Sequence, residues 1–129
     1  MNANARKWIA ALESGEYEQG MNFLMTTDNK YCCLGVACMI YNKSVLASDQ
    51  LVIETILGED EGEDKDYITV DGHAGVLPEP VRKWLKLITP SGAWAEPGCE
   101  LTGMNDAGNT FTEIADLIKS EPEGLFEYD

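Results

Sequence analysis

Hydrophobic residues are densest over Tyr31–Tyr41, a run with no charge between Lys30 and Lys43. Apolar side chains in this run fall on all sides of a helical wheel, not on one stripe. Such a pattern predicts a helix over residues 34–42 that is buried on most faces, around which the other elements pack. Gly35 lies inside the predicted helix and suits the close approach of another backbone.

Three further segments have the periodicity of helices with one apolar face. Residues 4–14 place Trp8 and Leu12 on the same face, which predicts the first helix. A short helix is predicted within residues 77–87, with prolines in its first turn. A helix from 110 to about 120 opens with a capping box, in which the Thr110 hydroxyl and the Glu113 carboxylate accept each other's backbone N–H groups.

Two turn signals predict β-hairpins. Asp28-Asn29 lies within residues 21–33, and Asp71-Gly72 lies within residues 67–76. Asp, Asn and Gly tolerate the left-handed backbone that a two-residue turn requires. Residues 44–57 are ambiguous: a helix is preferred for them, although their β-branched side chains also suit a strand.

The fold class that follows is α+β and mainly helical, a compact single domain of about four helices around the central apolar helix (34–42), with one or two short β-hairpins. We expect the domain to span residues 1–129, with a flexible acidic loop at 58–66 and an acidic tail at 121–129. No apolar run approaches the roughly 20 residues that cross a bilayer, and no signal-peptide pattern is present. We therefore expect a cytoplasmic protein.

The formal net charge of −14 narrows the class of partners. Nucleic-acid binding is not expected, because phosphate contacts need clustered Lys and Arg. Excess acid keeps proteins soluble, and this is the preferred interpretation. The alternative is an inhibitor that mimics DNA, whose carboxylates would imitate phosphates in a basic groove.

The four cysteines give no metal-binding spacing. The C-x-x-C pattern is absent, and a site made of Cys33, Cys38, Cys99 and His73 would have no sequence signature. We expect buried structural thiols, no metal and no cofactor.

Cys32 and Cys33 are nonetheless candidate nucleophiles, because they lie where a helix N-terminus would lower a thiol pKa. Gln19, the cysteines, His73 and Asn105 follow the chain order of the functional groups in papain-like hydrolases. This order predicts a cysteine-dependent hydrolase or transferase. The alternative interpretation is that both cysteines pack inward.

Asn105 and Asp106 form a candidate binding site in a glycine-containing loop ahead of the last helix. Their side chains could hold a ligand, with Tyr17 and Gln19 completing the site. They could equally tie down the loop through turns of the Asx type, which is the preferred interpretation. In that case Tyr17 and Gln19 anchor the neighbouring hairpin.

Four motifs in order carry a family resemblance, and they lie at Trp8–Gly20, Tyr31–Cys38, Leu77–Leu87 and Met104–Ile118. The chain resembles small uncharacterised proteins of tailed phages and prophages that share the pattern FCCLGVLCDL, LPxxVxxWLGL and LNDxGxTFxEIADLI. It is more distantly similar to plasmid and actinobacterial proteins with a CALGAL and WND pattern. The resemblance implies a mobile-element origin and no particular activity.

Together these observations favour a non-enzymatic accessory protein of phage type that binds a host protein or a small ligand. Its partner would be basic, given the charge of the chain. The cysteine-dependent enzyme and the DNA mimic remain alternatives.

Overall fold

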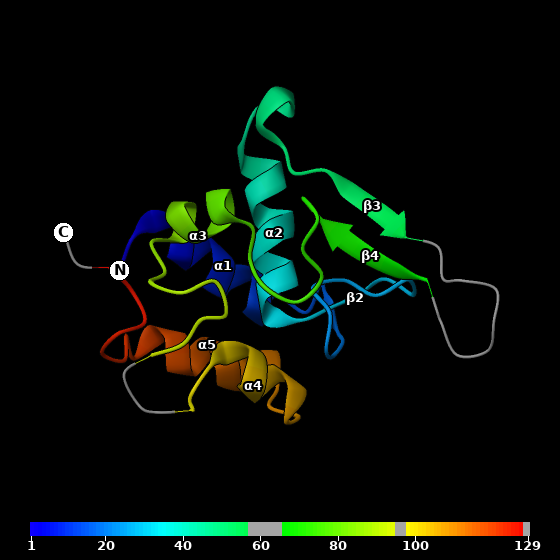
Figure 1. Ribbon diagram of the computed structural model, residues 1–129. Helices are drawn as coiled ribbons and strands as arrows, with labels where there is room; N and C mark the ends of the chain where they lie inside the picture. Colours follow the sequence, from blue (N-terminus) through cyan, green and yellow to red (C-terminus); the bar gives the residue numbers. More distant parts are fainter. Residues whose placement is uncertain (57–65, 95–97, 128–129) are drawn as a thin grey trace.

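The computed structural model describes residues 1–56, 66–94 and 98–127 of the chain. They form a compact, mainly helical α+β domain with two small two-stranded sheets, as the sequence predicts (Figure 1). The elements are α1 (Ala3–Glu13), β1 (Glu18–Gln19), β2 (Lys30–Tyr31), α2 (Cys33–Ser44), a 3₁₀ turn (Ala47–Asp49), β3 (Ile53–Ile56), β4 (Tyr67–Val70), α3 (Glu79–Leu85), α4 (Leu101–Asp106) and α5 (Phe111–Lys119).

Helix α2 is the centre of the fold, as its apolar sequence predicts. Residues 33–38 are buried, and α1, α3 and α4 all contact α2 (Figure 1). Gly35 faces the chain at Leu24 so closely that a Cβ on Gly35 would lie 1.7 Å from the Leu24 carbonyl oxygen. The missing side chain therefore sets the distance between α2 and the segment before it.

Side-chain N-caps determine where α1 and α5 begin. Asn2, not Asn4, caps α1 by accepting the Ala5 N–H at 2.8 Å. Asn4 instead donates its side-chain N–H to the Trp84 carbonyl at 3.0 Å, which ties α1 to α3. The predicted capping box of Thr110 is present at the start of α5.

The C-terminal tail folds back on the domain. Leu125 is buried, and Phe126 forms a β-bridge with Leu87 just after α3. Arg82 of α3 pairs with Glu127 of the tail at 3.3 Å and with Glu79 in its own helix. The predicted flexible loop falls almost wholly at 57–65, outside the described residues.

The hairpin expected at 21–33 is not formed as a continuous ladder. Lys30 and Tyr31 pair in parallel with β1, and a single antiparallel bridge joins Met25 to Tyr31. Asn22 has a φ of 72°, which interrupts the extended run. The predicted turn persists as a hydrogen bond of 2.8 Å from the Thr26 N–H to the Lys30 carbonyl.

The helix preferred for 44–57 is wrong, since β3 occupies its second half and pairs antiparallel with β4. Ile53, Thr55 and Ile56 are β-branched, and this preference prevails over the helical periodicity. Residues 73–76 are therefore not the main partner of β4. Asp71 and Gly72 do form the predicted turn, with φ of 49° and 83°, but it closes only one bridge, between Val70 and His73.

In the described ranges, no helix is long and apolar enough to cross a membrane.

We predict that Gly35→Ala destabilises the domain by about 3 kcal/mol or more, because the new methyl group would overlap the Leu24 backbone. Gly103→Ala is the matched control, since this glycine also lies in a helix but has open space around it. We expect the control to be neutral or to stabilise by up to about 1 kcal/mol. Urea unfolding of both variants provides the measurement, and equal midpoints would contradict the prediction.

Candidate functional site

Residues singled out in the sequence come together at the N-terminus of α2. Gln19 meets Asn105 and Asp106 there, more than 80 residues further along the chain, beside the backbone of Cys33. Asn105 and Asp106 lie on the short helix α4 and not in a loop, which corrects the sequence interpretation. Asn105 is fully buried, whereas Asp106 is exposed.

The Asn105 side chain caps α2 from across the fold. Helix α2 has Cys32 at its N-cap position, and this side chain makes no capping hydrogen bond. The Cys33 N–H, which would otherwise lack a partner, donates to Asn105 Oδ1 at 3.2 Å. Trp8 Nε1 donates to the Cys33 carbonyl at 2.8 Å, so the first residue of α2 is anchored on both sides.

Every hydrogen-bonding position of the Asn105 amide is occupied. Besides Cys33, Oδ1 accepts from Gln19 Nε2 at 3.0 Å. Nδ2 donates to the Gly20 carbonyl at 2.7 Å and makes a longer contact of 3.5 Å with Asp106 Oδ1. A saturated, buried amide supports the structural interpretation of this motif.

Gln19 and Asp106 extend the same network to the segment that follows β1. Gln19 Nε2 also donates to the Asn109 carbonyl at 2.7 Å, and Asp106 Oδ1 accepts the Asn22 N–H at 2.8 Å. These bonds hold residues 20–24 against α4. The segment exposes Met21 and Phe23, with half and two fifths of their surfaces accessible.

Tyr17 lies beside this network without a hydrogen bond to it in the described structure. Its ring makes an edge-to-face contact with Tyr31 at 5.4 Å, and its hydroxyl accepts from Lys43 Nζ at 3.0 Å. The hydrogen bond to Tyr17 raises the pKa of Lys43. Tyr17 therefore links the parallel sheet to the last turn of α2.

The thiols of Cys32, Cys33 and Cys38 are packing groups in this fold. Burial raises the pKa of Cys32 to about 11, and it also raises the pKa values of Cys33 and Cys38 well above that of a free thiol. The helix N-terminus favours the thiolate, but desolvation is the larger effect here. Cys33 Sγ lies 3.7 Å from the Leu101 carbonyl, at the contact of α2 with α4.

His73 stands apart from these groups. It is exposed in the turn after β4, and its backbone exchanges hydrogen bonds with Val70. No contact recorded among the described residues joins its imidazole to Cys32, Cys33 or Asn105. Of the papain-like order, the fold thus brings together the glutamine, the asparagine and a cysteine backbone, without the histidine. In the ranges described, no three His, Cys, Asp or Glu side chains gather as metal ligands.

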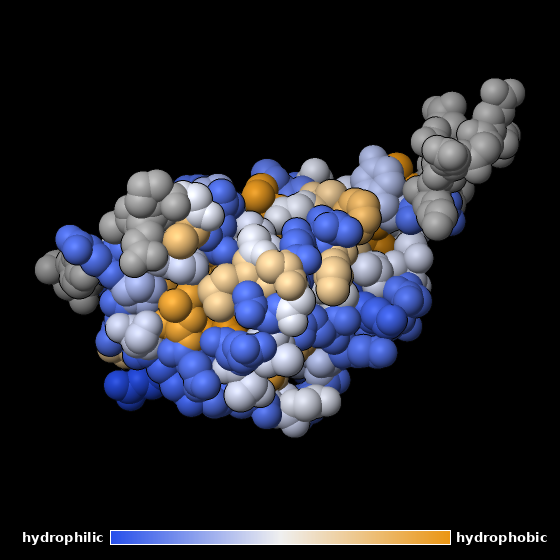
Figure 2. Space-filling model, turned by 90° about the horizontal axis from the view of Figure 1, so that it is seen from below, coloured by the Kyte–Doolittle hydropathy of each residue, from blue (hydrophilic) through white to orange (hydrophobic). Residues whose placement is uncertain are grey.

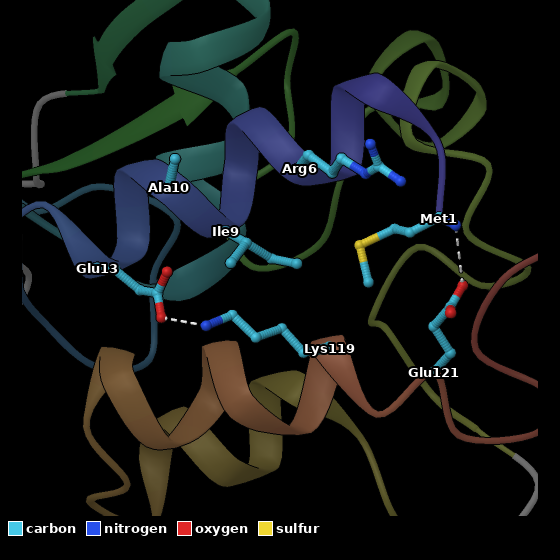
Figure 3. Close-up of a pocket in the computed structure, with 7 residues that line it drawn as sticks. All are labelled: Met1, Arg6, Ile9, Ala10, Glu13, Lys119 and Glu121. Atoms are coloured by element: carbon cyan, nitrogen blue, oxygen red, sulfur yellow. Dashed lines mark hydrogen bonds and ion pairs between the residues drawn. The ribbon is translucent and has the colours of Figure 1, made fainter.

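A separate hollow of about 370 Å³ lies between α1 and α5 (Figure 3). Ion pairs flank it: Lys119 Nζ lies 2.5 Å from Glu13, and the Met1 ammonium lies 3.5 Å from Glu121. Ile9 and the Met1 side chain give it apolar walls (Figure 3). The sequence gives no signal for this hollow, because it arises from the packing of helices that are distant in the chain. Its lining comprises Met1, Arg6, Ile9, Ala10, Glu13, Lys119 and Glu121.

Residues 1–122 match a family model described as a domain of unknown function, DUF8296, and the chain belongs to that family. The match shows a family of unknown function over most of the chain. The description of the family gives neither a phage origin nor an activity. The phage origin and the binding role therefore stay predictions. No curated protein and no solved structure matches the chain.

We predict that Asn105→Ala costs about 2–4 kcal/mol, because it strands the buried Cys33 N–H and the Gly20 carbonyl. Asn109→Ala is the control: Gln19 uses the backbone carbonyl of Asn109, which the substitution retains. Chemical denaturation of the two variants measures the difference. A loss below about 1 kcal/mol for Asn105→Ala would show that Asn105 is not the cap described here.

We predict that Cys32 and Cys33 react with iodoacetamide roughly a hundredfold or more slowly than a free peptide thiol at pH 8, because their raised pKa values leave little thiolate. Cys99 is partly exposed and should react first. Peptide mapping after timed alkylation gives the rates, and the same reaction in urea gives the reference. Faster alkylation of Cys32 or Cys33 than of the free thiol would restore the nucleophile hypothesis.

Proposed function

We propose that this chain is a non-enzymatic accessory protein of phage type, and that its acidic surface binds a basic partner protein. The observation that carries the proposal is the position of the charges: every Asp and Glu in the described part of the chain is exposed. The formal net charge is −14. Such a surface attracts a basic partner over about a Debye length and speeds its approach.

Several cations of the chain are already engaged by its own carboxylates. Arg82 pairs with Glu79 and Glu127, and Lys119 pairs with Glu13. These pairs reduce the local positive potential still further. The remaining field is strongly negative and suits a partner rich in Lys and Arg.

The candidate catalytic groups support binding over catalysis. The Asn105 amide makes four contacts within the chain, and the Cys32 and Cys33 thiols are desolvated. Apolar side chains interrupt the hydrophilic surface in a broken band across one face (Figure 2).

A second candidate function, the binding of a small ligand, is favoured by the hollow between α1 and α5. Its volume of about 370 Å³ lies within the range of ligand sites. Its apolar walls and flanking ion pairs would suit a small molecule with an apolar body and polar ends.

We predict that the tagged chain recovers a basic protein from a lysate of its bacterial host at low salt, and that the purified pair loses affinity as salt rises from about 50 to 300 mM, because screening weakens contacts between exposed charges. Calorimetry of the pair measures the salt dependence. An affinity insensitive to salt would contradict the acidic-surface mechanism. Recovery of no partner would contradict protein binding, and native mass spectrometry of the chain from the same lysate tests the small-ligand candidate.

A further inference from the structure

Strands β3 and β4 form a two-stranded arm beside α2 (Figure 1). The register pairs Ile53 with Val70 and Thr55 with Ile68. The Asp71 N–H donates to the Val52 carbonyl at 2.7 Å, which makes residues 52 and 71 a hydrogen-bonded pair. In an antiparallel ladder hydrogen-bonded pairs alternate with non-hydrogen-bonded pairs. The peptide groups of residues 54 and 56 therefore also point toward β4.

The peptide N–H and C=O groups of Ile53 and Thr55 therefore point to the outer edge of β3. No hydrogen bond among the described residues satisfies these groups from that side. The opposite edge of the arm is closed at its base, because Val70 and His73 exchange two hydrogen bonds of 2.8 and 3.0 Å. On β4 the same alternation leaves the peptide groups of Ile68 open, so β3 presents the longer open edge of the arm.

Apolar side chains accompany this edge. Val52 is 57% exposed, Ile53 is 42% exposed and Tyr67 on the neighbouring strand is 39% exposed. An exposed strand with unpaired backbone groups and apolar side chains is a template for another strand.

Charge decides which kind of strand the edge accepts. Glu54 lies on β3, and Asp49 and Asp71 lie just before it and just after β4. The sequence holds no Lys or Arg between Lys43 and Lys65. A second copy of the chain would bring the same acidic arm against this one, so self-pairing is disfavoured by repulsion.

We infer that the outer edge of β3 binds an extended segment of a basic partner protein as a third strand. This inference rests on the proposed function and names its surface. Peptide hydrogen bonds to Ile53 and Thr55 supply the pairing. Alternating apolar side chains of the incoming strand cover Ile53 on one face of the arm. Its Lys or Arg side chains lie on the other face, beside Val52 and Glu54, and meet the carboxylates there.

The test uses an eight-residue peptide of alternating lysine and valine, titrated into the full ¹⁵N-labelled chain. We expect the largest amide shifts at Ile53 and Thr55 and in the adjoining strand β4. A peptide with glutamate in place of lysine should not bind. The lysine peptide N-methylated at every residue should also fail, because neither of its edges then has an N–H to donate.

Thr55→Pro removes an outward N–H and leaves the pairing with β4 intact, so we expect it to weaken the lysine peptide roughly tenfold or more. Thr55→Ala keeps the N–H and should bind within about threefold of the unaltered chain. The N-methylated peptide needs no change in the protein, so the test stands even where the proline variant does not fold.

The outcomes separate the two proposals. Two results would overturn the proposal that the β3 edge binds the partner. In the first, the lysine peptide binds but the amide shifts lie away from β3. In the second, a partner binds the Thr55→Pro and unaltered chains equally. Either result leaves the acidic-surface proposal standing. If neither the peptide nor any partner binds, both proposals fall.

Discussion

The first turn of α2 has no cap of its own, and the domain is built around the way it acquires one. Cys32 occupies the N-cap position without a side-chain hydrogen bond, and Asn105 reaches it from α4. The same amide binds Gln19 and the Gly20 carbonyl, so one buried side chain fixes α4, the parallel sheet and the central helix together. A buried polar group is stable only when all its partners are present, and this makes the arrangement unique.

This constraint explains why the residues with the most suggestive chemistry are not available for it. Gln19, Asn105 and the Cys33 backbone lie together, as a catalytic interpretation requires, but they satisfy one another. Burial keeps the neighbouring thiols protonated, which is the opposite of what a cysteine nucleophile needs. The hydrogen bonds of this motif hold the fold together.

The surface, unlike the interior, has carboxylates, peptide groups and apolar side chains that are accessible to a partner. The described carboxylates are all exposed, and the outer edge of β3 offers peptide groups beside Val52 and Ile53. An acidic field and an open strand edge are complementary to the same kind of partner, one that is both extended and basic. The hollow between α1 and α5 is a separate feature of the surface, lined by apolar side chains and flanked by ion pairs.

The sequence by itself determined the features that depend on local spacing: the buried helix at 34–42, the capping box of Thr110, the turn at Asp71-Gly72 and the mainly helical α+β class. Tertiary structure decided which segments pair. β3 takes the place of residues 73–76 beside β4, β1 pairs with β2 in parallel, and Asn105 lies on a short helix. The physical reason is that strand pairing and a cap supplied from more than 70 residues away are contacts between distant segments, and no local periodicity records them.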